Sequence, residues 1–363
     1  MVTSRLPPAW VVRPLFALRN GLSRFCDAIV PPQLPLAERL FGIADTKTIA
    51  AAAELGIADL LAQGRSDAAS LAVACGVDPE ALARVMRYLV SRGLFQADRR
   101  GLYRNNRVSL LLRTGQTTSQ HAWARFVGSR WHVDIWNHLD EAVRSGDAAA
   151  VAAFGHSFWE QLTRVDPEAG SLFDSAMEDA CRLQTALIPR IHDFSSSRKV
   201  CDVGGGTGTV IASVLAANPI PRGVLLDLPS VIARAKPVLN RAGVGDRVEL
   251  EGGDFFEAVP GGCDRYLLQA IVHDWDDESC VRILTNVRTA MARDGRILVF
   301  EQELSRRGGR DLAKLLDLEM LVDTGGGRER TGQEFAALFD RADLRIARKR
   351  ALPVMTMFEL VAS

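Results

Sequence analysis

His273, in the second half of the chain, has the side chain best suited to moving a proton near neutral pH. An imidazole with a pKa of about 6.5 can accept a proton and later release it, which is the basis of general acid–base catalysis. A lone histidine is more often structural. This one follows the apolar run Tyr266–Val272 and begins the sequence His-Asp-Trp-Asp-Asp. Its position at the end of a predicted strand favours a catalytic role.

Two carboxylates follow other apolar runs and could bind a nucleoside. Asp227 comes directly after Gly223–Leu226, where its carboxylate could accept hydrogen bonds from both hydroxyls of a ribose. Asp254 and Phe255 come after Arg247–Glu251, where a carboxylate can accept from an adenine amino group while a ring packs nearby. The structural alternatives are a helix cap at Asp227 and a simple turn at Asp254.

A glycine-rich segment follows the first of these apolar runs. Gly204, Gly206 and Gly208 stand at alternate positions after Val200–Val203, and they let the backbone turn sharply and a ligand approach closely. The spacing is not the G-x-G-x-x-G of dinucleotide-binding loops, so it favours a cofactor with an amino-acid moiety over a diphosphate. A purely structural turn is the alternative for the glycines alone. Together with the two carboxylates, they outline one adenosine site.

These side chains require a scaffold that brings several strand ends to one edge. From Lys199 onward, short apolar runs alternate with helical segments such as Thr209–Ala217 and Pro229–Leu239. The five runs lie at Val200–Val203, Gly223–Leu226, Arg247–Glu251, Tyr266–Val272 and Arg296–Glu301. This alternation predicts an α/β fold with a parallel sheet and helices on both faces. Two later runs, Arg345–Ala351 and Met357–Val361, predict a closing antiparallel pair.

The first third of the chain predicts a different, mostly helical fold. The Ala-rich helix Thr48–Leu61 and a helix–turn–helix pattern at Asp67–Cys75 and Pro79–Arg92 precede two short wing-like strands near Phe95 and Tyr103. This is the pattern of a winged helix, a fold that often binds DNA. Basic residues only slightly outnumber acidic ones in this region, which favours packing or dimerisation over DNA binding.

An N-terminal arm precedes the winged-helix region. Leu15, Leu18, Leu22, Phe25 and Ile29 recur at steps of three and four residues, which places them on one face of a predicted helix. We expect this face to pack on its own domain or on a dimer partner. The alternative is a helix that lies on a membrane surface.

Charge and cysteine content limit the partners and the compartment. The 363 residues include 44 basic and 44 acidic ones, so no global field would hold nucleic acid or an anionic membrane. Prolines and arginines interrupt the first thirty residues, which predicts no signal peptide. The six cysteines lack metal or redox spacing. We therefore expect a cytoplasmic protein with free thiols, no metal, no nucleic-acid partner and no stable membrane association.

Five motifs carry a resemblance to a known family. They are DVGGGTG at 202–208, LLDLP at 225–229, GGDFF at 252–256, HDWDDE at 273–278 and GGRERT at 326–331. In this order and spacing they resemble the plant caffeate-type and bacterial polyketide-tailoring O-methyltransferases, over nearly the whole chain. The last two motifs are the specific ones, because the glycine loop is shared widely among methyltransferases. The resemblance implies a Rossmann-like class I methyltransferase sheet with an antiparallel final strand, plus a winged-helix dimerisation domain.

The resemblance also implies site residues. It implies S-adenosylmethionine as cofactor, a small phenolic or polyketide-like aromatic substrate, His273 as general base, and Glu301 and Glu329 as its flanking acids. The implied cofactor contacts are Gly204, Gly206, Asp227, Asp254, Phe255 and Gln269, and the implied substrate-pocket residues are Met177, Met320 and Thr324. Gln269 stands where plant members usually carry lysine. The alternative for the two glutamates is a strand-end charge and an ion pair with Arg328 or Arg330.

Domain organisation follows from the same resemblance. We expect a homodimer built from an arm (1–35), a winged-helix-like dimerisation domain (36–120), a helical connector lining the substrate pocket (121–195) and an S-adenosylmethionine-binding domain (196–363). The arm is longer than in many members of the family.

The chemistry favours a hydroxyl acceptor. A phenol has a pKa of about 10 and is mostly neutral at pH 7, so a base at His273 would make it a better nucleophile. The alternatives are N- or C-methylation, a relative that no longer transfers methyl groups, and a winged-helix DNA-binding regulator that senses S-adenosylmethionine.

Overall fold

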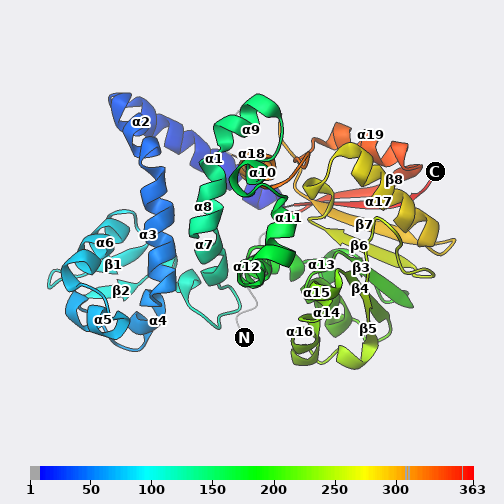
Figure 1. Ribbon diagram of the computed structural model, residues 1–363, viewed down its shortest axis with the longest axis horizontal. Helices are drawn as coiled ribbons and strands as arrows, with labels where there is room; N and C mark the ends of the chain where they lie inside the picture. The colour runs from blue at the N-terminus through cyan, green and yellow to red at the C-terminus, as the bar shows by residue number, and fades with distance from the viewer. Residues whose placement is uncertain (1–8, 307–308, 310, 354) are drawn as a thin grey trace. The chain divides into compact units, whose positions relative to one another are not determined.

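The computed structural model describes residues 9–306, 309, 311–353 and 355–363. The described chain divides into two compact units, labelled by element in Figure 1. The sheet unit comprises the N-terminal residues up to Phe25, then His138–Glu160 and Gln184–Ser363. The helical unit comprises Cys26–Asn137 and Gln161–Leu183.

The sheet unit contains a seven-stranded sheet in the order β5-β4-β3-β6-β7-β9-β8. Its strands are β3 (Lys199–Val203), β4 (Arg222–Asp227), β5 (Val248–Gly252), β6 (Arg265–Gln269), β7 (Arg296–Glu301), β8 (Leu344–Ala351) and β9 (Thr356–Ala362). The first five of these strands are parallel, whereas β9 pairs antiparallel with both β7 and β8. The carboxyl ends of β3, β4, β6 and β7 therefore meet at one edge, as predicted.

Helices cover both faces of this sheet (Figure 1). One core packs alternate strand residues against α17 (Asp277–Ala290) and α19 (Gly332–Arg341). The other packs the intervening strand residues against α13 (Ile188–Ile191), α14 (Thr209–Ala217) and α16 (Ala235–Arg241). Side chains alternate between the faces of a strand, so a strand buried on both sides needs a continuous apolar run, as the sequence has here.

Shorter elements complete the sheet unit. They are α9 (Leu139–Ser145), α10 (Ala149–Phe154), α11 (Phe158–Glu160), α15 (Pro229–Ile232), α18 (Leu312–Asp323), and the 3₁₀ turns Gly245–Arg247 and Val272–Asp274. Two predicted elements differ from the observed ones. The helix expected over Pro229–Leu239 is split into α15 and α16. The strand expected over Tyr266–Val272 ends at Gln269, because Ala270 has φ = 53° and turns the chain out of the sheet.

The helical unit has the predicted helix–turn–helix and wing. Its elements are α2 (Gln33–Leu40), α3 (Gly42–Glu54), α4 (Ile57–Ala62), α5 (Ala68–Cys75), α6 (Pro79–Ser91), β1 (Phe95–Ala97), β2 (Tyr103–Asn105), a 3₁₀ turn (Ser109–Leu112), α7 (His121–Val127), α8 (Arg130–Trp136), a π-helical turn (Gln161–Val165) and α12 (Pro167–Thr185). Asp67 and Asp78 cap α5 and α6, each accepting a backbone N–H. The single helix expected over Thr48–Leu61 is interrupted at Gly56, which is left-handed. These differences are local and leave the predicted pattern intact.

The arm forms the helix α1 (Ala9–Ala28), which passes from the sheet unit into the helical unit. Its predicted apolar face does not pack on the chain itself. Leu15, Leu18, Leu22, Phe25 and Ile29 are 56–66% exposed, so the expectation of packing on its own domain is wrong. Among the helices that the structure describes, none is long and apolar enough to cross a membrane.

Candidate active site

The glycine loop between β3 and α14 has a backbone that only glycine fits easily. Gly204, Gly206 and Gly208 have φ of 65°, 60° and 84°. A Cβ on Gly204 would also lie 2.6 Å from Ile271 Cδ1 and 3.3 Å from Phe255 Cε1. Both the left-handed backbone and this close approach exclude a side chain at Gly204. The loop therefore brings bare backbone to the carboxyl edge of the sheet.

Asp202, the first residue of DVGGGTG, lies in β3 and connects this strand to the helix on the other side of the loop. Its side chain is buried, and Oδ2 accepts a hydrogen bond from Ile211 N at 3.1 Å in the first turn of α14. Burial raises the pKa of this carboxyl group to about 7, opposed by that hydrogen bond and reinforced by the charge of Asp227. Sequence reasoning did not single out this residue, although the motif that contains it was the available signal.

Asp227, at the end of β4, holds the same loop. Oδ2 accepts from Gly206 N at 2.8 Å, and Oδ1 accepts from Leu228 N at 2.7 Å. Burial raises its pKa, and these two N–H donors oppose the change. The helix cap considered for Asp227 is not formed, because α15 begins after Leu228 without a side-chain cap.

Asp254, Phe255 and Gln269 lie around the same edge. Asp254 is exposed, and its Oδ1 accepts from Phe256 N at 2.8 Å, which is the turn geometry considered above. The Phe255 ring packs edge-on against Trp275, with ring centroids 6.0 Å apart. Gln269 Nε2 donates to Gln184 Oε1 at 3.4 Å, whereas Gln269 Oε1 is buried and has no hydrogen-bond partner among the described residues.

His273 lies in the 3₁₀ turn Val272–Asp274 that follows β6, and its side chain is 13% exposed. The ring nitrogen Nδ1 is 3.0 Å from Glu329 Oε1, and Nε2 is 3.3 Å from Asp274 Oδ1. Asp274 is a second acid that sequence reasoning missed, although it is part of the HDW motif. The imidazole thus lies between two carboxylates.

Glu301, the last residue of β7, fixes the turn that carries His273. Its Oε1 accepts from Ile271 N at 3.0 Å and from Val272 N at 2.7 Å. The other carboxylate oxygens, Glu301 Oε2 and Glu329 Oε2, are buried without a hydrogen-bond partner in the described part of the chain. One nitrogen of His273 and one oxygen of each glutamate lie within 4.8 Å of one another. The structure therefore brings the predicted histidine and both predicted glutamates together.

The electrostatics of this cluster favour a charged imidazole. Burial alone would lower the pKa of His273, but the charges of Asp274, Glu301 and Glu329 raise it to about 10. Burial raises the pKa of Glu301 to about 7 and that of Asp274 to about 6, and the charge of His273 partly opposes both changes. At pH 7 the imidazole of His273 is therefore protonated.

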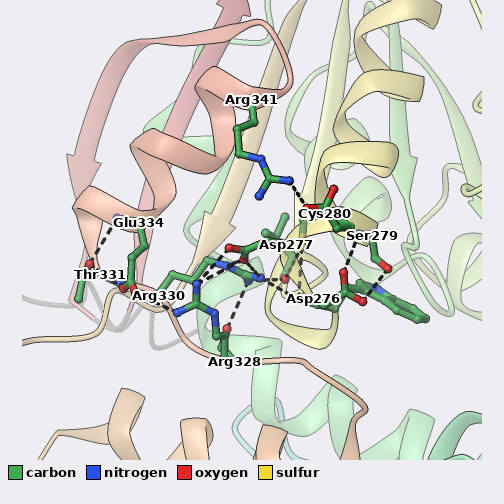
Figure 2. A network of polar contacts seen from close by, with 12 residues as sticks. Asp276, Asp277, Ser279, Cys280, Arg328, Arg330, Thr331, Glu334 and Arg341 are labelled. Atoms are coloured by element: carbon green, nitrogen blue, oxygen red, sulfur yellow. Dashed lines mark hydrogen bonds and ion pairs between the residues drawn. The ribbon is translucent and has the colours of Figure 1, made fainter.

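The arginines considered as partners of Glu329 have another partner. Arg328 and Arg330 pair with Asp277, at 3.2 and 2.7 Å, as Figure 2 shows. The carboxylate of Glu329 instead contacts His273, and its backbone N–H donates to Asp317 Oδ1 at 2.9 Å.

The three predicted substrate-pocket residues occupy two elements. Met320 and Thr324 are buried at the end of α18, where Thr324 Oγ1 donates to Met320 O at 2.8 Å. Met177 is half-buried on the part of α12 that belongs to the helical unit.

Comparisons with known proteins identify the family. One family model, an O-methyltransferase domain, matches residues 136–345, and a second, an O-methyltransferase dimerisation domain, matches residues 37–115. The mitomycin biosynthesis 6-O-methyltransferase of Streptomyces lavendulae is 38% identical over 86% of this chain and 89% of the relative. The phenazine-1-carboxylate N-methyltransferase of Pseudomonas aeruginosa is 36% identical over 87% and 93%. The aclacinomycin 10-hydroxylase RdmB of Streptomyces purpurascens is 33% identical over 87% and 85%.

Solved structures agree with this assignment. LaPhzM has a TM-score of 0.85 and 34% identity, covering 92% of this chain and 100% of its own. An O-methyltransferase from neocarzinostatin biosynthesis, solved with S-adenosylmethionine and 2-hydroxy-5-methyl naphthoic acid, has a TM-score of 0.75 and 30% identity, covering 88% and 96%. With the matching domains and the glycine loop, these likenesses place this chain in the family of S-adenosylmethionine-dependent O-methyltransferases, with S-adenosylmethionine as its methyl donor.

Proposed function

We propose that this enzyme methylates a hydroxyl group of a small aromatic metabolite and that His273 removes the proton of that hydroxyl. The observation that carries the proposal is the cluster of His273, Asp274, Glu301 and Glu329 at the carboxyl ends of β6 and β7. Of these strands, β6 pairs directly with β3, whose glycine loop opens at the same edge. A proton acceptor and a cofactor loop at one edge are what methylation of a weakly acidic hydroxyl requires.

The residues at this edge fit the cofactor. S-adenosylmethionine, when bound, supplies an electrophilic methyl group on a sulfonium that is already a good leaving group. The bare backbone at Gly204 and Gly206 would receive its amino-acid portion, and Asp227 and Asp254 would accept from its adenosine hydroxyls and amino group. The buried, unpartnered Gln269 Oε1 supports this assignment, because such an acceptor normally has a donor.

His273 has a proton affinity suited to a phenol. With a pKa of about 10, the imidazolium and a phenol are acids of similar strength, so proton transfer between them is nearly balanced. Only the neutral imidazole can accept the proton, so His273 must first lose the one it holds at pH 7. Asp274 and Glu301, with pKa values near 6 and 7, are weaker bases than this imidazole, so its proton goes to solvent and the neutral fraction grows as the pH rises towards 10.

The two glutamates act through the imidazole. Glu329 accepts a hydrogen bond from Nδ1 and so fixes the orientation of the ring. This leaves Nε2 as the nitrogen that faces the hydroxyl of the substrate. Glu301 holds the backbone of the turn through Ile271 and Val272, and its charge stabilises the imidazolium. These roles make proximity and charge the main contributions of the protein.

The substrate class is supported by the relatives. The related structure from neocarzinostatin biosynthesis contains a hydroxynaphthoic acid, and we propose an aromatic ring of comparable size here, contacted by Met320 and Thr324 of the sheet unit. The test is incubation with trideuteromethyl-labelled S-adenosylmethionine and a panel of phenols, hydroxyquinones and phenazines, followed by mass spectrometry. A deuterated methyl ether is the expected product. Labelling of carbon or nitrogen alone would overturn the proposal.

N-methylation is the second candidate. The observation that favours it is the raised pKa of His273, because a group that keeps its proton at pH 7 is a poor base. A heteroaromatic nitrogen needs no deprotonation, and one relative carries the name of a phenazine N-methyltransferase. The same panel distinguishes the two, because the label is carried by oxygen in one case and by nitrogen in the other.

We further propose a homodimer that uses the exposed apolar face of α1. Four large apolar side chains on one face of α1, with Ile29 directly after the helix, are unusual on the surface of a monomer. The matched dimerisation domain begins at residue 37, inside α2, the helix that follows α1 in the chain. The four-part division of the chain given above remains part of this proposal.

A further inference from the structure

Arg330 is the largest side chain that is fully buried in the described chain, and every nitrogen of its guanidinium is used. Nε and Nη2 donate to Asp277 Oδ1 at 2.9 and 2.7 Å. Nη1 donates to Val272 O and Nη2 to Trp275 O, both at 2.8 Å. A guanidinium holds its donors in a fixed planar fork, so it binds one carboxylate and two carbonyls at once in set directions.

These contacts join the two segments that carry the proton-transfer residues. Val272 and Trp275 lie on either side of His273 and Asp274, while Arg330 directly follows Glu329 in the chain. The backbones also touch, because Arg328 N donates to His273 O at 2.8 Å. A Cβ on Gly327 would lie 2.7 Å from that same carbonyl oxygen. Figure 2 shows Arg330 and Asp277 at the centre of this network.

We propose that Arg330 and Asp277 form a buried clamp that holds the His273 turn against the Glu329 loop, which makes Arg330 a positioning residue for the imidazole. Glu329 reaches His273 only if the two loops keep their spacing. Their direct backbone contact is one hydrogen bond, so the side-chain clamp supplies most of the polar connections. The significance of the clamp for the reaction rests on the proposed function, but its effect on His273 does not.

A purely structural ion pair would have a different signature. It would stabilise the fold, but a folded variant lacking it would keep the environment of His273. The groups that face His273 are Asp274 on its own turn, Glu301 from β7 and Glu329 from the neighbouring loop. Lysine at position 330 keeps the positive charge but loses the fork, so direct electrostatics would leave the pKa of His273 unchanged. Any fall in that pKa would then report a change in geometry.

The first test is an NMR titration of the apoenzyme labelled with ¹³C in its histidine rings, with the His273 signal assigned from a His273→Asn variant. In Arg330→Lys we expect the proton dissociation constant of His273 to rise about tenfold or more, because its carboxylates move away. Arg341→Lys is the matched control, since Arg341 at the end of α19 pairs with Glu278, the neighbour of Asp277 on α17, but at the surface (Figure 2). An unchanged constant in a folded Arg330→Lys protein would overturn the clamp.

A second charge-conserving variant, Asp277→Glu, covers the case in which Arg330→Lys does not fold. It displaces the carboxylate by one methylene and should raise the same dissociation constant. If every folded clamp variant keeps the wild-type titration of His273, the pair is structural only.

The kinetic test is a double-mutant cycle with Glu329→Gln. Arg330→Lys should lower kcat about 10- to 100-fold, with little change in KM for S-adenosylmethionine, and should have a much smaller effect in the Glu329→Gln background. Additive effects would show that Arg330 does not act through the His273–Glu329 contact. If His273→Ala kept full activity, the proposed base would fail, but the titration would still decide the clamp.

Discussion

His273 Nδ1 lies 3.0 Å from Glu329 Oε1, although the two residues are 56 positions apart in the chain. This contact leaves Nε2 as the nitrogen that exchanges a proton, and it adds a buried negative charge beside the ring. Asp274 is 3.3 Å from Nε2, so an acceptor hydroxyl must compete with it or displace it. The orientation and the proton affinity of the imidazole are thus set by the same carboxylates.

Glu329→Gln should move the pH dependence of the reaction. The charges of Asp274, Glu301 and Glu329 raise the pKa of His273 to about 10, and only the neutral ring is a base. In the wild type, kcat/KM should therefore rise with pH and level off only near 10. Removing one carboxylate lowers the pKa, so the rising limb should shift to lower pH, with a lower plateau because the imidazolium loses support.

Steady-state rates from pH 6 to 10.5 would measure that shift. Glu278→Gln is a suitable control, since this exposed carboxylate on α17 pairs with Arg341 away from the ring. If kcat/KM rose over the same pH range in Glu329→Gln and in wild type, Glu329 would not be one of the groups that raise the pKa of His273.

Asp227→Ala should weaken binding of the cofactor. The variant lacks the carboxylate that we propose binds the ribose. It also lacks the observed hydrogen bonds from Leu228 N and from Gly206 N, the second of which holds the glycine loop. A charge-assisted hydrogen bond contributes about 1.5–3 kcal/mol, so the dissociation constant for S-adenosylmethionine should rise about 10- to 150-fold. Titration calorimetry measures this directly, with the exposed Asp246→Ala as control. Equal affinity in the variant and wild type would refute the role.

Asp202→Asn should change how stability depends on pH. Burial raises the pKa of Asp202 to about 7 from an ordinary value of 3.8. The folded protein therefore binds this proton more tightly than the unfolded chain, and its contribution to stability is lost as pH rises from about 4 to about 7. The variant has no such group, so its free energy of unfolding relative to wild type should increase across that interval.

Urea unfolding of the apoenzyme at pH 5 and pH 8 would test this. The amide itself can change the free energy of unfolding by an amount that is the same at both pH values. The test uses only the part of the difference that changes with pH. Parallel pH profiles would show that Asp202 is ionised in the folded protein throughout.

The scaffold could be predicted from the sequence because its central strands β3, β4, β6 and β7 are buried on both faces. Such strands are continuous apolar runs, and the predicted Thr209–Ala217 helix and Arg296–Glu301 strand coincide with α14 and β7. The end of β6 was misplaced by three residues, because Ile271 and Val272 are apolar yet lie beyond the sheet. Only the backbone of Ala270 and the carboxylate of Glu301 turn them out of it.

Site residues were harder to find when their role depends on contacts between distant segments. The strand-end rule indicated Asp227 and His273, because the ends of parallel strands share an edge. It could not indicate Arg330, whose partners lie more than fifty positions away. The exposed face of α1 was identified from its spacing, but spacing cannot tell which surface covers it.

The arm prediction concerns the oligomer. The double variant Leu18→Glu/Leu22→Glu places two charges on the exposed face of α1, where both leucines are more than half exposed. We expect wild type to be a dimer by light scattering and the variant to dissociate at concentrations at least about tenfold higher, because buried charges oppose association. Ile220→Glu, at another exposed apolar site, is the control. A wild-type mass that stays monomeric at every concentration would exclude the dimer.

The last prediction concerns His273→Ala. Loss of a general base typically costs about 10²–10⁴-fold in rate, and we expect a loss of that size in kcat at pH 7. Binding of S-adenosylmethionine should be unaffected, because its proposed contacts lie on other residues. The defect should shrink once the pH passes the pKa of the phenol, about 10, since solvent then supplies the phenolate.

That pH dependence separates a base from a residue that shapes the pocket. A shaping residue would reduce the rate equally at all pH values, because phenolate would not replace its contacts. The raised pKa of His273 sets the pH at which to look, because below pH 10 the neutral imidazole of wild type and the phenolate in the variant both increase with pH, and the two rates converge only above pH 10. A flat defect in His273→Ala, or full activity at pH 7, would remove the main support for a hydroxyl acceptor and favour a nitrogen or carbon acceptor instead.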